Sequence, residues 1–268
     1  MKKNVVLLLI SMFMLSVNLQ TVSAQVAIVE ESAVIENVEV SNMETKTAAE
    51  QSDLSVENDE PLKVETFKAG GIPISIPQPC VDLVEVGYDV REQMEIFVIP
   101  QNRLLSAYMI PSEIPRFSSG EENFVLSKSA AIQVFRQGEY QAFGESDFNE
   151  LVEYEKSAAG AELSSIATDT EAEMNRRMDS LNLEQVKINT PLDLGALFSK
   201  PNAYSFGMIV KYSDNVKTWT TVIATTYIRV RDRLLFAYVT ATYKDSETIA
   251  MVSKVSEEWA DAIIAANQ

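Results

Sequence analysis

Three long runs of β-forming residues, joined by very short turns, restrict the fold of this chain more than any other feature. They cover residues 204–212, 217–229 and 233–243, and short turns such as SDN and VRD separate them. Shorter runs at 186–188 and 192–198 come before them. Strands joined by such short connections are antiparallel neighbours, because a parallel pair needs a crossover of about a dozen residues or more. The last third of the chain therefore predicts an antiparallel sheet.

The strand at 233–243 is apolar on both of its faces, which predicts a layer of structure on each side of the sheet. A helix is expected from about residue 247 to 266, with Trp259 in its apolar stripe. Ala237 and Ala241 leave room for this helix to approach the strand. The two faces of the strand are Leu235, Ala237, Val239, Ala241 and Tyr243, and Leu234, Phe236, Tyr238, Thr240 and Thr242.

The string RLLFAY at 233–238 has a near copy, RLLSAY, at 103–108. We interpret the two as interior strands with similar neighbours. An ancestral duplication is the alternative, but six residues are too few to support it. In the earlier strand, alternation predicts Leu105, Ala107 and Met109 on one face. It predicts Leu104, Ser106 and Tyr108 on the other face.

Proline positions, helix-capping residues and hydrophobic periodicity predict the other elements. We expect an edge strand in GGIPISIPQP, a strand in VDLVEVGY, a helix opened by Asp89 and Glu92, a helical turn at 112–117 and a strand within 123–135. Two helices fill the middle. The first carries Phe148, Leu151, Val152 and Glu155, and the second carries Leu163, Ile166, Thr170, Met174, Met178 and Leu181. Residues 67–268 are thus predicted to form one α+β domain, an antiparallel sheet with helices on both faces.

The N-terminus has the pattern of a secretory signal peptide. Lys2 and Lys3 come before an apolar run, and Val22-Ser23-Ala24 is typical of a cleavage site. A membrane anchor is the alternative, but the run is short of the about 20 apolar residues that a spanning helix needs. We predict a signal peptide over 1–24, export to the periplasm or medium, and no integral membrane span after cleavage.

Residues 25–66 differ from the rest of the chain in composition. They hold eleven acidic and two basic residues, with no aromatic residue and no glycine. Such a segment has little apolar surface to offset the entropy of ordering, so we expect a disordered acidic linker. A short helix around 26–40 is the rival interpretation.

The absence of histidine excludes several chemistries. The chain has no histidine and one cysteine, Cys80. A Ser-His-Asp or Cys-His system cannot be built, and zinc sites of the His-rich or Cys/His type are excluded. A disulfide within the chain is likewise impossible. Carboxylate, lysine or oxygen-ligated metal chemistry remains, or no catalysis.

The net charge of -17 argues against nucleic acid and anionic lipid as partners.

The carboxylate motifs all have simpler explanations. Glu257 and Asp261 are four residues apart on the final helix and could act as an acid–base pair, but they lie opposite the apolar stripe and fit a solvated face. Asp147, Asn149 and Glu150 copy only part of a calcium loop and fit a helix N-terminus better. We therefore predict no catalytic residue, no metal ligand and no cofactor.

A ligand pocket is the remaining candidate site. Trp219, Tyr227, Phe236 and Tyr238 could line a pocket on one sheet face, with Thr221, Thr240 and Thr242 as polar groups. Cross-strand aromatic pairs in an ordinary core explain the same residues.

RLLFAYVTATYKDSETIAMVSKVSEEWADAIIAAN resembles the ending of a group of uncharacterised bacterial exported proteins. IPQNRLLSAYMI and PLDLGALFSKPNAYSFGMIVKY resemble other parts of that group, over roughly residues 70–268. More remotely, the strand order and final helix resemble the PsbP-like α/β/α sandwich. The resemblance implies a fold and a compartment and supplies no active residue. Our hypothesis is a non-catalytic exported protein of the cell envelope that binds or assists an envelope protein or a small ligand. The alternative is a carboxylate-based hydrolase acting on an envelope polymer.

Overall fold

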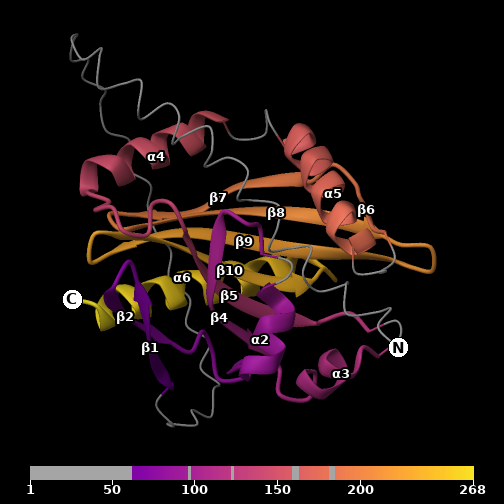
Figure 1. Cartoon of the computed structure of the whole chain (residues 1–268). Helices are drawn as coiled ribbons and strands as arrows, with labels where there is room; N and C mark the ends of the chain where they lie inside the picture. Colours follow the sequence, from indigo (N-terminus) through magenta and orange to yellow (C-terminus); the bar gives the residue numbers. More distant parts are fainter. Residues whose placement is uncertain (1–61, 96–97, 122–123, 159–162, 181–184) are drawn as a thin grey trace, which may run out of the picture.

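A large antiparallel sheet forms the centre of the protein. The computed structural model describes residues 62–95, 98–121, 124–158, 163–180 and 185–268. The expected signal peptide and nearly all of the expected linker lie outside these residues. The strands of the sheet are β3 (Val84–Glu85), β4 (Asn102–Met109), β5 (Lys128–Phe135), β6 (Lys187–Ile188), β7 (Leu192–Lys200), β8 (Ala203–Ser213), β9 (Thr218–Val230) and β10 (Arg233–Thr242). Their order is β3-β4-β5-β10-β9-β8-β6, with β7 also paired to β8 (Figure 1).

The two strings RLLSAY and RLLFAY lie in β4 and β10, on either side of β5. Both strands pair with β5 in antiparallel fashion, so β4 and β10 run in the same direction. β10 is paired along both edges, to β5 and β9, whereas β4 is paired along its length to β5 and to the two-residue β3 only at Tyr108 and Met109. The prediction of an interior strand is therefore confirmed for RLLFAY, and RLLSAY has a partner strand on its second edge only at its end.

A separate two-stranded sheet comes before the main one. It is the hairpin of β1 (Val64–Ala69) and β2 (Ile72–Pro77). The edge strand expected in GGIPISIPQP is present as β2, but its partner β1 was not expected. The expected end of the linker at residue 66 falls inside β1, which begins at Val64. The hairpin turns through Gly70 and Gly71, whose φ angles are 55° and 83°. At Gly70 a Cβ atom would lie 1.8 Å from the Glu139 carbonyl oxygen, so this position has no room for a side chain.

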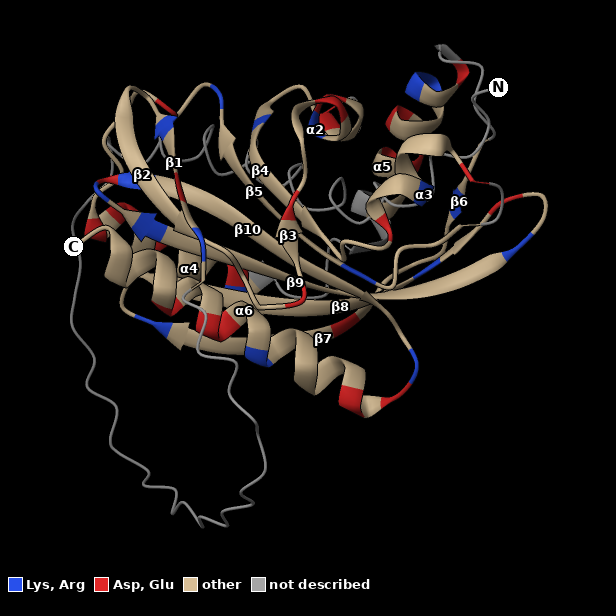
Figure 2. Ribbon diagram, turned by 90° about the horizontal axis from the view of Figure 1, so that it is seen from below, with Lys and Arg blue, Asp and Glu red and all other residues tan. Residues whose placement is uncertain are grey.

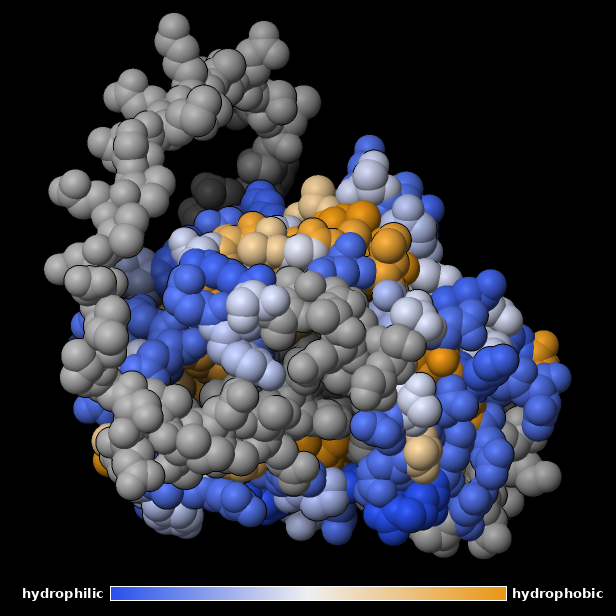
Figure 3. All heavy atoms as spheres, turned by 90° about the horizontal axis from the view of Figure 1, so that it is seen from above, coloured by the Kyte–Doolittle hydropathy of each residue, from blue (hydrophilic) through white to orange (hydrophobic). Residues whose placement is uncertain are grey.

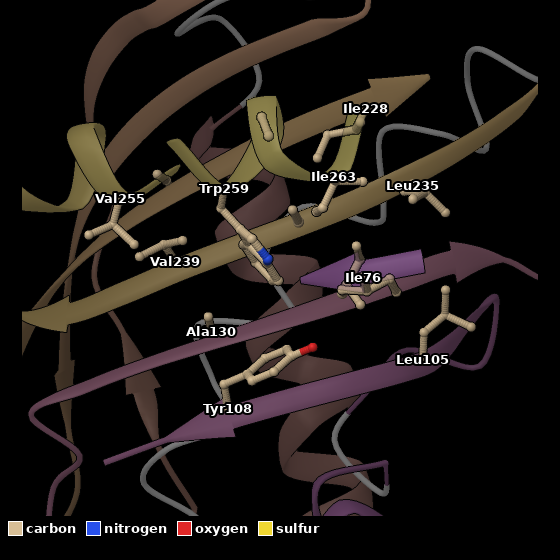
Figure 4. Packing of buried hydrophobic residues seen from close by; sticks show 14 of the residues in the cluster. Ile76, Leu105, Tyr108, Ala130, Ile228, Leu235, Val239, Val255, Trp259 and Ile263 are labelled. Carbon is tan, nitrogen blue, oxygen red and sulfur yellow. The ribbon is translucent and has the colours of Figure 1, made fainter. Parts of the chain in front are cut away.

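One face of the sheet is covered by the hairpin and by α6 (Ser246–Ala266). Asp245 begins the helix by accepting a hydrogen bond from the Thr248 amide at 3.0 Å. Trp259 points from α6 onto the sheet, where its ring meets Tyr108 edge to face at 5.6 Å (Figure 4). Its Nε1 donates to the Pro77 carbonyl at 2.7 Å. The tryptophan thus joins helix, sheet and hairpin, as its place in the apolar stripe predicted for the helix and sheet.

Four helices cover the opposite face. They are α2 (Tyr88–Glu95), α3 (Ile114–Ser119), α4 (Glu145–Ala158) and α5 (Leu163–Ser180). The core under α4 and α5 includes Phe148, Leu151, Met174, Met178, Ile223, Tyr227, Phe236 and Tyr238. The core under α2 and α3 includes Val90, Met94, Leu104, Ala107, Met109, Phe117 and Ala131. The α+β class and the antiparallel sheet with helices are as predicted.

Strand β4 departs from the predicted alternation. Its register against β5 shifts between Leu104 and Ser106, where one residue is inserted. Leu105 and Tyr108 therefore share the face covered by α6, and Leu104, Ala107 and Met109 share the other. The predicted faces of this strand were wrong because a bulge changes the phase of the alternation and leaves no mark in a hydrophobic pattern.

The expected strand in VDLVEVGY is also much shorter than predicted. Only Val84 and Glu85 pair with β4, because the residues before them turn: the Leu83 amide donates to the Cys80 carbonyl at 3.3 Å.

Among the described residues, none of the helices is long and apolar enough to cross a membrane. On the face seen in Figure 3, hydrophilic residues predominate, with a band of hydrophobic residues near the top of the view and smaller hydrophobic patches elsewhere.

Candidate functional site

Three of the four residues predicted to line a pocket lie together beneath α4. Tyr227 and Phe236 are cross-strand partners in β9 and β10, and their rings meet edge to face at 5.6 Å. Tyr238 is two residues further along β10, on the same face. Phe206 of β8 packs on the other side of Tyr227 at 5.7 Å. Strand alternation and register thus build one aromatic cluster, which α4 covers.

Trp219 is the exception. It lies eight residues before Tyr227 in the same strand, which is about 26 Å at the usual rise of a β-strand. Its ring stacks on Tyr212 at 5.5 Å, beside the end of β6. All four predicted residues are at most 7% exposed. The predicted set is therefore divided between two places in the same core.

Two of the three threonines expected to serve the pocket, Thr240 and Thr242, form hydrogen bonds within the protein. The Thr240 and Ser129 hydroxyls are 2.7 Å apart, and the Thr242 hydroxyl donates to the Leu126 carbonyl at 2.8 Å. These bonds connect β10 to the start of β5. They satisfy side chains that would otherwise be buried without partners.

A buried carboxylate, Glu155, stands above the aromatic cluster. It projects from α4 with the apolar residues of that helix, and its Oε1 accepts a hydrogen bond from the Tyr227 hydroxyl at 2.9 Å. Burial, followed by the charge of Glu155, raises the pKa of Tyr227 well above its ordinary value. The phenol therefore stays protonated and donates. In the sequence Glu155 lies among the apolar residues of the helix, and no role was predicted for it; a charged residue at such a position was the available signal.

Among the described residues, three carboxylates are buried, and each has a structural partner. Glu155 bonds to Tyr227. Glu113 accepts from the Ser127 hydroxyl at 2.7 Å and from its amide. Glu139 pairs with Arg103 and accepts from the Gly70 amide at 2.9 Å. Each bond connects segments that are distant in sequence or joins a loop to the sheet, so each carboxylate acts as a local tether.

The helix-face pair Glu257 and Asp261 shares one lysine. Lys200, at the end of β7, lies 2.9 Å from Glu257 and 2.7 Å from Asp261. Their carboxylate side chains are 45% and 55% exposed. Such partly solvated ion pairs connect β7 to α6 and contribute little to stability.

Cys80 has the environment of an unreactive thiol. Burial, together with a hydrogen bond to Asp82 at 3.0 Å, raises the pKa of the Cys80 thiol to about 12. A nucleophilic cysteine needs the opposite shift, because the thiolate is the reactive form.

The partial calcium motif is a helix start. Asp147 accepts from the Gly144 amide at 2.7 Å, at the first turn of α4. In the part of the chain that the structure describes, no group of three or more Cys, Asp or Glu side chains could hold a metal ion.

One end of the sheet is rich in arginine, and we call it the arginine end: Lys68, Arg103, Arg136, Arg229, Arg231 and Arg233. The first arginines of the two repeated strings hold the same turn from either side. Arg103 of β4 pairs with Glu139, and Arg233 of β10 donates to the Gln141 carbonyl at 3.0 Å. The arginines of the two copies therefore have the same structural role, which is to hold this turn. Figure 2 shows blue segments gathered at this end, where the C-terminus also lies.

Comparison with known proteins gives little. No family model matches the sequence, and no curated protein sequence matches it. Among solved structures, a mutant of the protein Mog1 has 12% identity, with 76% of this chain and 90% of that chain covered, at a TM-score of 0.30. The Saccharomyces cerevisiae Ran-binding protein Mog1p has 9% identity, with 77% and 94% covered, at 0.28. Similarity at this level assigns neither a family nor a function.

Proposed function

We propose that this protein is an exported, non-catalytic component of the cell envelope that binds or assists an envelope partner. The observation that carries the non-catalytic part is the use of the buried carboxylates. Glu113, Glu139 and Glu155 each hold a structural hydrogen bond, and the predicted aromatic residues are core. The compartment rests on the N-terminal sequence pattern alone.

The finer features of the fold belong to the same proposal. The antiparallel sheet with helices on both faces is the arrangement expected of a PsbP-like α/β/α sandwich. The C-terminal sequence pattern favours membership of an uncharacterised group of bacterial exported proteins. Both ideas agree with a domain that acts by contact rather than by chemistry.

Export is tested by fractionating cells that express the chain with a C-terminal tag. We expect the protein in the periplasm or the medium, with a mature N-terminus at Gln25. A matched variant carries Lys2→Glu and Lys3→Glu, which should slow export because the positive n-region is lost. Full-length protein retained in the cytoplasm would overturn the compartment.

Function is tested by crosslinking the exported protein in cells and identifying what it captures. We expect the crosslinks to capture a reproducible envelope partner or a bound small molecule. We also expect the protein to leave this partner chemically unchanged. The carboxylate-based hydrolase is the outcome that would replace this proposal, since Glu155 offers one buried carboxylate. It requires that purified protein releases soluble fragments from an envelope polymer, and that Glu155→Gln abolishes this release while Glu150→Gln, on the exposed side of α4, does not.

A further inference from the structure

The residues of the arginine end share neighbours, because they contact the β1–β2 hairpin and the turn at 139–141. The Arg103 guanidinium donates to the Lys68 carbonyl at 2.6 Å, and Arg231 donates to the Pro73 carbonyl at 3.2 Å, so both hold the β1–β2 hairpin. Arg136 donates to the carbonyl of Asn102, the residue next to Arg103, at 2.8 Å. Strand ends and turns that are far apart in sequence therefore present their cationic side chains together.

This surface also carries an exposed aromatic residue. Tyr140 is 75% exposed and lies between Glu139 and Gln141, the two residues held by Arg103 and Arg233. The Arg136 side chain is 45% exposed. Tyrosine and arginine are the residue types most enriched at the energetic centres of protein interfaces. The composition thus points to a peptide or protein as the ligand.

The charge of this surface is opposite to that of the rest of the protein. Three of its six cationic side chains form ion pairs: Arg103 with Glu139, Arg136 with Glu95, and Arg229 with Asp232. Over residues 62–268 as a whole, acidic residues outnumber Lys and Arg by 29 to 19. An acidic segment is therefore repelled by most of the domain and attracted to this one end.

We propose that the arginine end is the docking site of the chain's own acidic segment, residues 25–61. This segment holds ten carboxylates and one lysine. It joins the domain just before β1, and the six residues of that strand run about 20 Å to the hairpin turn beside Arg103. A segment of 37 residues spans this distance easily. Its attachment gives it an effective concentration in the millimolar range, so a weak contact suffices to fill the surface.

The contact is electrostatic and therefore depends on salt. Exposed charges are screened over about 10 Å at 0.1 M salt and about 3 Å at 1 M. Docking of the segment should be strong at low ionic strength and mostly lost in 1 M NaCl. An apolar contact with the hairpin or with α6 would not weaken in this way.

A photo-crosslinking residue in the purified full chain tests the proposal. We replace Tyr140 with p-benzoyl-phenylalanine, irradiate at low salt, and identify crosslinked peptides by mass spectrometry. We expect crosslinks to residues 25–61 within the monomer, at least about five-fold weaker in 1 M NaCl. The same probe at Tyr88, an equally exposed tyrosine of α2 at 67%, is the matched control and should give little crosslink to the segment.

Two sets of charge variants separate docking from folding. Neutralising Glu30, Glu31, Glu36 and Glu39 to Gln leaves every described residue intact and should reduce the Tyr140 crosslink several-fold. Lys68→Glu with Arg136→Glu should do the same, with the melting temperature of each protein as the control. Equal crosslinking from positions 88 and 140, crosslinks only between separate chains or to another protein, or no effect of segment charge would each overturn the proposal.

Discussion

Trp259 is the residue in which the contacts of three separate elements meet. It is 1% exposed, its ring packs on Tyr108 of β4, and its Nε1 bonds to Pro77 of β2. This one side chain therefore connects α6 with the main sheet and with the hairpin. Such a residue contributes through packing and one buried hydrogen bond together.

Trp259→Ala should lower the free energy of unfolding by about 3–5 kcal/mol, the range for truncating a large buried aromatic side chain. Trp259→Phe should cost less, because a ring still fills most of the space while the bond to Pro77 is lost. Urea unfolding of the two variants beside the parent measures both. An unchanged midpoint for Trp259→Ala, with a binding activity lost, would show that the ring serves a ligand and that this helix face is assigned wrongly.

At the scale of the element, the β1–β2 hairpin is attached to the sheet through Glu139. Burial by itself raises the pKa of this carboxyl, but the Arg103 guanidinium and the Gly70 amide outweigh burial and hold its pKa below the usual range. A lowered folded-state pKa means that the ionised form stabilises the native state. This stabilisation is complete above the unfolded pKa of about 4.3 and is lost as the pH falls through the lower folded value.

Acidification should therefore weaken the hairpin attachment. We expect the stability of the parent to fall between about pH 5 and pH 3, and Glu139→Gln to be less stable at pH 7 with a shallower fall over that range. Denaturant unfolding as a function of pH measures this. Glu145→Gln, an exposed neutral substitution in α4, is the control. Parallel pH curves for the parent and Glu139→Gln would contradict the assigned role.

At the scale of the whole molecule, β1 is the first element of the domain that the structure describes. Val64 and Thr66 pair with Pro77 and Ser75 of β2, and β2 in turn contacts Trp259 through Pro77. These contacts make the hairpin part of the described core.

Two deletions should separate the segment from the fold. Removing residues 25–61 should leave the melting temperature within a few degrees of the parent. Removing 25–66 also takes half of β1 and should cost about 2 kcal/mol, or about 4–8 °C for a domain of this size. Differential scanning calorimetry of the three chains decides between them. A large loss in the shorter deletion would place residues 25–61 in the folded core.

The sequence by itself determined the elements that have a strong local signal. Long alternating runs with short turns predicted β8, β9 and β10, and an apolar stripe at helical spacing predicted α6. Alternation and turn length need only neighbouring residues to be read. The apolar character of both faces of β10 even predicted the layers on each side.

The tertiary structure alone decided which distant segments meet. Nothing local in VETFKA indicates that it pairs with β2, and the bulge in β4 shifts its faces without a change in composition. The bond between Glu155 and Tyr227 and the grouping of the arginines at one end arise from register and packing. Such contacts are set by elements far apart in the chain, because the free energy that selects them comes from burying whole faces together and appears only when the sheet is assembled.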